Sequence, residues 1–164
     1  MRAQVRAQEG KRCRPTAAIL DSQSVKSNPH GGEVGYDAAK KIKGRKRHIL
    51  VDTLGLLLGI VVTPTDTTER DGAQALLQRT LTVFTWLRRL WVDGGYAGTV
   101  FSSWVRNLRS QLEVQVVKRS DDTKGFKVLP RRWVVERTFA WFMRHRRLVR
   151  DYDTNSTPPI GLIP

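Results

Sequence analysis

The chain has 164 residues, with 29 Lys and Arg against 15 Asp and Glu, which gives a formal net charge of +14. This length suits one ordinary domain, and the charge indicates a polyanionic partner: nucleic acid first, an anionic membrane surface second. The single cysteine, Cys13, excludes an intrachain disulfide and a cysteine-rich zinc site, and the longest apolar stretch (residues 54–62) is far shorter than the ~20 residues of a spanning helix. We therefore expect a soluble protein of a reducing cytosol.

The first part of the chain predicts a basic arm, a buried strand and a loop. Residues 1–16 are basic and polar without clean periodicity, which indicates a loose arm. Residues 17–21 form a short apolar run ending in Asp21, typical of a buried strand. Glycine and proline predict a loop over residues 27–35, and a basic segment follows at residues 40–47.

A hairpin and then an alternation of helices and strands are predicted next. Two β-rich runs, residues 48–51 and 56–63, indicate the hairpin, and Asp71 is expected to cap a helix that starts near Gly72. The acids around this connector, Glu69 among them, take capping as their default role. Further elements are expected over residues 87–93 (strand), 99–109 (helix), 112–117 (strand) and 131–150 (helix). This order favours a mixed-sheet α/β domain.

Three acids are candidates for chemistry. Asp21 and Asp93 each end a predicted strand, where ligand sites of α/β sheets gather, and glycines follow Asp93 at once. Glu136 lies among large apolar residues of the last predicted helix, so we do not expect it on a solvent face. On that helix Glu136 shares a face with Arg132 and Arg147. Three carboxylates suit Mg²⁺ or Mn²⁺, and two such ions can activate an attacking oxygen and stabilise a leaving one.

Each acid also has a simpler interpretation. A strand-end aspartate is usually a turn or cap residue. Glu136 could pair with Arg132, which lies four residues earlier on the same helix.

Three segments, in order, resemble the acid-bearing motifs of DDE-type insertion-sequence transposases of the bacterial cut-and-paste class. They are residues 19–26 (ILDSQSVK), residues 91–96 (WVDGGY) and residues 133–141 (WVVERTFAW), and the resemblance spans residues 17–152. Their acids are 72 and then 43 residues apart. The basic segment and the hairpin that follows it also fit this family.

The resemblance implies a ribonuclease-H-like fold, a mixed sheet flanked by helices. It also implies metal-dependent DNA cleavage and strand transfer during movement of an insertion sequence. Asp21, Asp93 and Glu136 would be the catalytic residues and would bind two Mg²⁺ or Mn²⁺ ions per active site. The partner would be double-stranded DNA, at the element ends and at the target, and the protein could form a homo-oligomer on it. It would act in the bacterial cytoplasm, at the nucleoid. The residues expected to contact DNA are Lys43, Arg45, Lys46, Arg47, Arg132 and Arg147.

The chain departs from the family pattern in two ways. Leu129 and Met143 stand where relatives often have Tyr and Lys, and Arg147 is a candidate substitute for that Lys. The flanks are short, so we expect a catalytic core truncated at both ends: a basic arm (residues 1–16), the catalytic domain (17–152) and a flexible tail (153–164). Two alternatives stay open, an inactive remnant that only binds DNA and a ribonuclease-H-like nuclease. A membrane role is disfavoured because the charges do not form one amphipathic helix.

Overall fold

The computed structural model describes residues 1–27, 33–117, 132–150 and 161–162. The strands are β1 (Ala17–Lys26), β2 (Gly35–Asp37), β3 (Ile42–Asp52), β4 (Leu57–Pro64), β5 (Arg89–Val92), β6 (Glu113–Val116) and β7 (Gly161–Leu162). The helices are α1 (Arg2–Gln8), α2 (Glu69–Val83), α3 (Thr99–Leu108), α4 (Trp133–Arg144) and α5 (Arg146–Val149), with a 3₁₀ turn η1 (Gly94–Tyr96).

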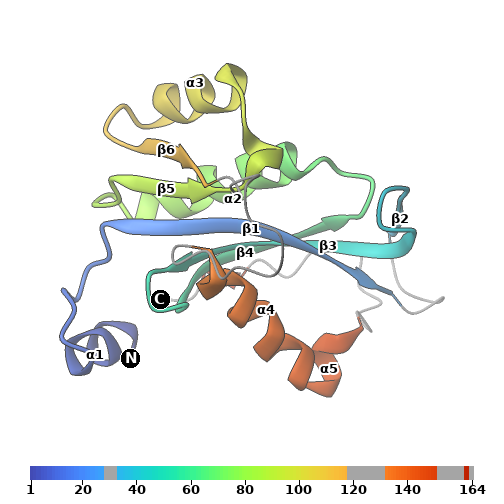
Figure 1. Ribbon diagram of the computed structural model, residues 1–164, viewed down its shortest axis with the longest axis horizontal. Helices are drawn as coiled ribbons and strands as arrows, with labels where there is room; N and C mark the ends of the chain where they lie inside the picture. The colour runs from blue at the N-terminus through green and yellow to red at the C-terminus, as the bar shows by residue number, and fades with distance from the viewer. Residues whose placement is uncertain (28–32, 118–131, 151–160, 163–164) are drawn as a thin grey trace, which may run out of the picture.

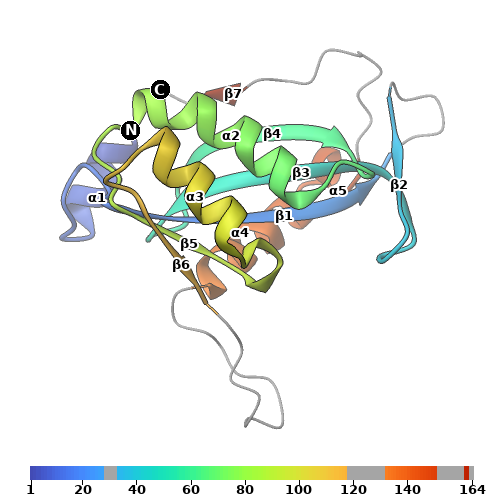
Figure 2. The same cartoon turned by 90° about the horizontal axis from the view of Figure 1, so that it is seen from above.

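A mixed sheet forms the middle layer of the molecule. Its strand order is β6-β5-β1-β3-β4-β7, with β2 paired to β3 beside this path. Helices α2 and α3 lie on one face of the sheet, and α4 and α5 lie on the other (Figures 1 and 2). The predicted ribonuclease-H-like α/β fold, a mixed sheet flanked by helices, is confirmed.

Strand β1 separates two hydrophobic cores because its side chains alternate between the faces. Ala18 and Leu20 pack in the core that α2 and α3 cover. Ile19 packs on the other face, with Val135 and Phe139 of α4. The side chains of Ile19 and Asp21, two residues apart in β1, therefore both point towards the face that α4 covers.

Strand β1 does not end at Asp21 as predicted. It continues to Lys26 because β3 pairs antiparallel with it from residue 18 to residue 26 and satisfies its backbone groups. The basic run from Lys43 to Arg47, for which no strand was predicted, is part of β3 for the same reason. The predicted hairpin is confirmed as β3 and β4.

Two helix boundaries also differ from the prediction. Helix α2 begins at Glu69, and its N-cap is Thr68, whose hydroxyl accepts a hydrogen bond from the Asp71 amide at 3.1 Å. Asp71 thus lies in the first turn and is not the cap. The long helix expected over residues 131–150 breaks at His145, whose extended backbone separates α4 from α5, so Arg147 does not continue the face of α4. Residue 131 lies outside the described residues.

The N-terminal arm is docked, which corrects the expectation of a loose one. Arg6 of α1 is buried and forms an ion pair with the buried carboxylate of Asp52. Asp52 also accepts hydrogen bonds from the Leu54 and Leu56 amides, both at 2.9 Å, and so shapes the β3–β4 turn. At the other end of the chain, residues 161–162 pair with β4 as β7, whereas the rest of the predicted tail lies outside the described residues.

The β3–β4 turn also holds α4 in place. Gly55 has a left-handed φ of 83°, which favours glycine. Its carbonyl accepts a hydrogen bond from the Thr138 hydroxyl at 3.2 Å, and the Leu54 carbonyl accepts one from Arg137 at 2.9 Å. The turn therefore fixes the helix that carries Glu136 against the sheet.

Candidate active site

Strand pairing places Asp21 and Asp93 side by side. Strands β1 and β5 run parallel, and Ile19 pairs with Trp91. Asp21 and Asp93 each lie two residues beyond this pair, so they project from the same face of the sheet. Asp93 directly follows Val92, the last residue of β5, whereas β1 continues past Asp21. The two acids are thus at the end of the parallel pairing, as the sequence indicated, although Asp21 lies within its strand.

The two carboxylates share one cationic group. Nη2 of Arg132, just before α4, lies 3.1 Å from Oδ2 of Asp21 and 3.7 Å from Oδ2 of Asp93. All three side chains are partly shielded, with 17% of Arg132, 15% of Asp21 and 28% of Asp93 exposed. A phosphate contact by Arg132 stays a prediction, and the structure places its guanidinium between the two acids. The position between them therefore attracts positive charge.

Burial makes the carboxyl group of Asp21 a weaker acid than usual. It raises the pKa of Asp21 from 3.8 to about 6. The Ser22 amide, which donates to Oδ1 of Asp21 at 2.7 Å, and the charge of Arg132 both lower this pKa, while the charge of Asp93 raises it. The rise shows that the available hydrogen bonds and the one guanidinium do not fully compensate the desolvation of this carboxylate.

The turn after Asp93 is held from two sides. Oδ1 of Asp93 accepts a hydrogen bond from the Gly95 amide at 2.9 Å and so caps η1. Arg70, in the first turn of α2, donates to the carbonyl oxygens of Gly95 at 3.2 Å and Ala97 at 2.7 Å. The start of α2 therefore fixes the segment that carries Asp93.

Tyr96 brings a buried hydroxyl to this turn. The side chain is fully buried, and its hydroxyl has no hydrogen-bond partner among the described residues. Burial raises the pKa of Tyr96, and the negative charges of Asp21 and Glu69 raise it further. The phenol therefore lies close to the acids while its own polar atom stays unpaired.

Glu69 is a neighbour of the site, although its position in the sequence predicted only a capping role. Its Oε1 accepts a hydrogen bond from the Ser22 hydroxyl at 3.3 Å and lies 3.5 Å from Nζ of Lys40. As the first residue of α2, it resembles any acid at a helix start, for which capping is the default. Only the packing of α2 against the β1–β5 end brings it to Asp93, and the local sequence carries no signal of that.

Glu136 is exposed, so the expectation of a shielded position is wrong. Its apolar neighbours Val135 and Phe139 face the sheet, which leaves Glu136 on the outer flank of α4. Its side chain forms no ion pair or hydrogen bond with any described residue. Within the described ranges, no three His, Cys, Asp or Glu side chains lie close enough to bind one metal ion together.

The sequence of the chain matches the family described as "Transposase DDE domain" over residues 12–156. The chain belongs to this family. No curated protein matches it. The matched residues include Asp21, Asp93 and Glu136. The two acids that converge in this transposase domain, Asp21 and Asp93, are thus both within the matched region. In the part of the transposase that the structure describes, no helix is both long and apolar enough to cross a bilayer.

The donor chemistry of this transposase fits a divalent cation in part. Asp21 and Asp93 supply the oxygen ligands that Mg²⁺ and Mn²⁺ prefer, and a guanidinium already lies between them. Mg²⁺ is commonly bound by one or two carboxylates together with substrate phosphates. The two aspartates could therefore bind a metal ion, but Glu136 does not form a three-acid cluster with them within the described residues.

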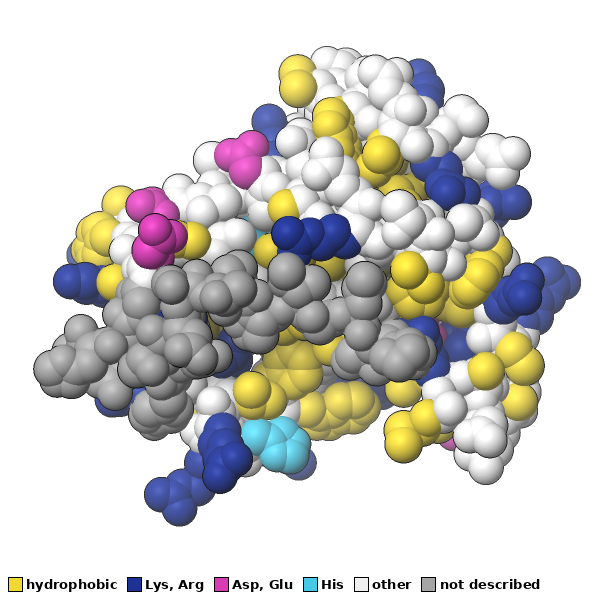
Figure 3. Space-filling model, turned by 180° about the vertical axis from the view of Figure 1, so that it is seen from behind, with side chains coloured by type: hydrophobic (Ala, Val, Ile, Leu, Met, Phe, Trp, Pro, Cys, Tyr) yellow, Lys and Arg dark blue, Asp and Glu magenta, His cyan; other side chains and the backbone are white. Residues whose placement is uncertain are grey.

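The basic residues of the transposase fall into two groups. Arg45, Lys46 and Arg47 are buried, and each donates to a backbone carbonyl elsewhere in the chain, at 3.1, 2.8 and 2.6 Å respectively. DNA contact by these three stays a prediction, and it would require them to leave these bonds. Lys43 and Arg147 are exposed. Figure 3 shows Lys and Arg at several separate places on one face of the molecule, and not in a single patch.

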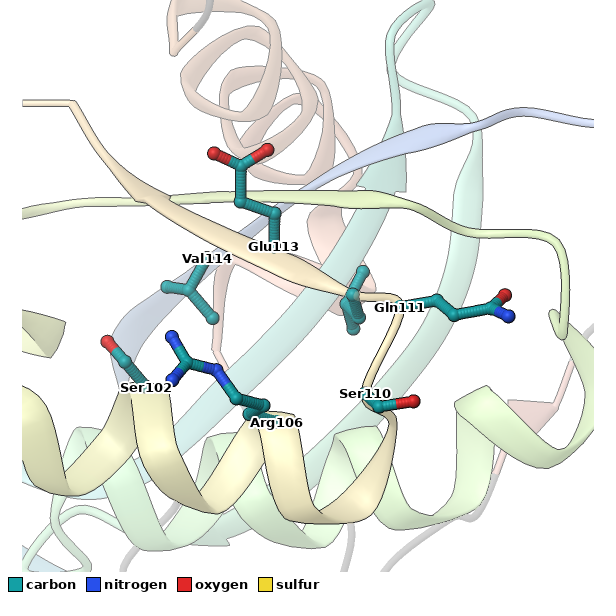
Figure 4. Close-up of a pocket in the computed structure, with 7 residues that line it drawn as sticks. Ser102, Arg106, Ser110, Gln111, Glu113 and Val114 are labelled. Carbon is teal, nitrogen blue, oxygen red and sulfur yellow. The ribbon is translucent and has the colours of Figure 1, made fainter.

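A surface pocket of about 230 Å³ lies elsewhere in the fold. It opens between α3 and β6, where Ser102 and Arg106 of the helix lie opposite Val114 of the strand, whereas the side chain of Glu113 points away from the helix (Figure 4). None of the predicted site acids lines it. We therefore do not assign it to the active site of the transposase.

Proposed function

We propose that this transposase domain catalyses metal-dependent DNA cleavage and strand transfer during the movement of an insertion sequence. The observation that carries the proposal is the convergence of Asp21 and Asp93, which strand pairing brings to one cationic group although they are distant in sequence. Two aspartates that share the guanidinium of Arg132, in a member of a transposase family, are best explained as a centre for phosphoryl transfer on DNA.

Asp21, Asp93 and Glu136 would hold Mg²⁺ or Mn²⁺, two ions per active site. Such ions, when bound, activate an attacking oxygen and stabilise a leaving oxygen of a phosphodiester. Glu136 lies one turn after Arg132 and has no ion pair with a described residue, so its carboxylate is available to the site. Arg132 keeps the charges of the two aspartates compensated, and it is close enough to them to meet a phosphate of the substrate.

The partner would be double-stranded DNA, both at the element ends and at the target. The exposed Lys43 and Arg147 would contact phosphates, which supply affinity without sequence information. We therefore expect duplex binding with a steep salt dependence, about −5 in log affinity against log salt for about six phosphate contacts. Action on paired ends would require a homo-oligomer, and the place of action would be the bacterial cytoplasm, at the nucleoid.

The test is a product assay on DNA duplexes that carry the element ends, with Mg²⁺ or Mn²⁺ and a target plasmid. We expect wild-type protein to give both cleaved ends and joined products, and Asp21→Asn, Asp93→Asn and Glu136→Gln each to abolish both. Glu9→Gln, a change at an exposed acid beyond α1, is the matched control. Loss of activity in the control, or activity in Asp93→Asn, would contradict the proposal.

A DNA-binding remnant is the second candidate, favoured by the exposure of Glu136 and by the absence of a three-acid cluster in the described ranges. It predicts salt-dependent binding without any cleavage. A nuclease on the same fold predicts cleavage without joining. The same product assay separates these two candidates from a transposase.

A further inference from the structure

A fourth carboxylate, that of Glu69, lies at the candidate active site and has not been given a role in it. It is about two-thirds shielded, with 33% of its side chain exposed, and its Oε1 is occupied by Ser22 and Lys40. Its second oxygen, Oε2, forms no hydrogen bond or ion pair with any described residue. One carboxylate oxygen is thus anchored and the other is open to a ligand.

The backbone at Gly95 shows where that open oxygen lies. A methyl group built on Gly95 would lie 2.8 Å from Oε2 of Glu69 and 3.1 Å from Oδ1 of Asp93. Both oxygens therefore border the same small space, which exists because residue 95 has no side chain. By contrast, a methyl group on the neighbouring Gly94 would meet nothing within 4 Å.

An independent polar group faces the same acids. The hydroxyl of Tyr96 is fully buried and has no hydrogen-bond partner among the described residues. Burying an unpaired hydroxyl is costly. A hydrated ion held beside Asp93 and Glu69 would give this hydroxyl the partner that it lacks.

We propose that Glu69 is a further metal-binding residue of the transposase, which together with Asp93 holds a divalent cation at the space beside Gly95. This rests on the proposed function and deepens it. Arg132 lies on the Asp21 side of Asp93, whereas Glu69 lies on the Gly95 side, so Asp93 stands between two positions for positive charge. Two carboxylates are enough for Mg²⁺ or Mn²⁺ when water and phosphate complete the shell. Glu69 would then be a metal ligand in addition to Asp21, Asp93 and Glu136, at the ion on the Gly95 side of Asp93.

The experiment is a Mn²⁺ titration of the full chain by calorimetry, with electron paramagnetic resonance to count free ions. Wild-type protein is expected to bind two ions. Glu69→Gln is expected to lose one ion or weaken it at least about tenfold, the effect typical of lost metal-site partners. Gly95→Ala, which pushes Glu69 away through its new methyl group, is expected to act in the same direction. Gly94→Ala and Glu9→Gln are the matched controls.

Each outcome is decisive, provided that circular dichroism shows folded variants. Unchanged binding in both Glu69→Gln and Gly95→Ala, with loss in Asp93→Asn, would overturn the role of Glu69 and leave the proposed function standing. No Mn²⁺ binding by wild-type protein would overturn both. Weakening by Gly94→Ala to the same extent as by Gly95→Ala would show a general effect of the turn and would also overturn the role of Glu69.

Discussion

Replacing Arg132 with Gln should strengthen divalent metal binding, although Arg132 lies next to the acids that would bind the metal. The guanidinium contacts Asp21 at 3.1 Å and Asp93 at 3.7 Å, so an ion shared by these carboxylates must displace it. A hydrogen bond to a charged group contributes about 1.5–3 kcal/mol. Since about 1.4 kcal/mol corresponds to a tenfold change in affinity, the Mn²⁺ dissociation constant of Arg132→Gln should fall by about 10- to 100-fold.

The assay is a Mn²⁺ titration of metal-free protein at low ionic strength, followed by the shift in melting temperature on adding metal. Arg144→Gln is the control, because it removes an exposed positive charge from the same helix without touching the acids. An unchanged or weaker Mn²⁺ affinity in Arg132→Gln would refute the argument that the guanidinium and the ion compete. An equal gain in Arg144→Gln would show that only net charge matters.

Three further predictions concern the free energy of unfolding. Because the pKa of Asp21 is raised from 3.8 to about 6, its contribution to stability is complete below pH 3.8 and lost as the pH rises through 6. In EDTA at pH 8, the free energy of unfolding of Asp21→Asn should therefore be up to about 3 kcal/mol higher than that of wild type. Urea unfolding measures this gain, which should be absent at pH 3.5. Gly72→Ala should cost about 1–3 kcal/mol, because its methyl group would lie 2.1 Å from the buried His48 ring, whereas Gly94→Ala should be neutral within about 0.5 kcal/mol. Arg6→Ala removes the ion-pair partner of the buried Asp52 carboxylate and should cost about 3–5 kcal/mol; a smaller loss, or no faster proteolysis of α1, would contradict a docked arm.

The sequence was sufficient for the β3–β4 hairpin and for the acid pair because both depend on short apolar runs. Residues 17–20 and 90–92 are apolar runs followed directly by an acid, and parallel pairing of such segments brings their ends together. The polar stretch after Asp21 hid the rest of β1, because its pairing partner β3 is itself rich in basic residues. The charge of residues 45–47 gave no indication of a strand, and their side chains donate to backbone carbonyl groups that are distant in the chain.

The remaining parts of the site depend on packing between segments that are far apart in the chain. Glu69 reaches Asp93 only because α2 lies against the end of the β1–β5 pair, and nothing in the residues around Glu69 encodes this. The exposure of Glu136 depends on which flank of α4 faces the sheet, and the mixed apolar and basic pattern of that helix left this open. The break at His145 likewise has no proline or glycine to mark it.

The order of pairing in the sheet has a consequence for how the site forms during synthesis. Strands β1, β3 and β4 pair with one another within the first 64 residues, so this half of the sheet can form while the rest of the chain is still on the ribosome. Strand β5 joins β1 only after residue 89 has emerged, and Arg132 meets Asp21 across 111 residues. Long-range pairings of this kind are slow to form because their loop entropy must first be overcome. The acid pair is therefore created by a late folding step, so a nascent or locally opened chain would keep its antiparallel strand pairings but lack the assembled acid pair.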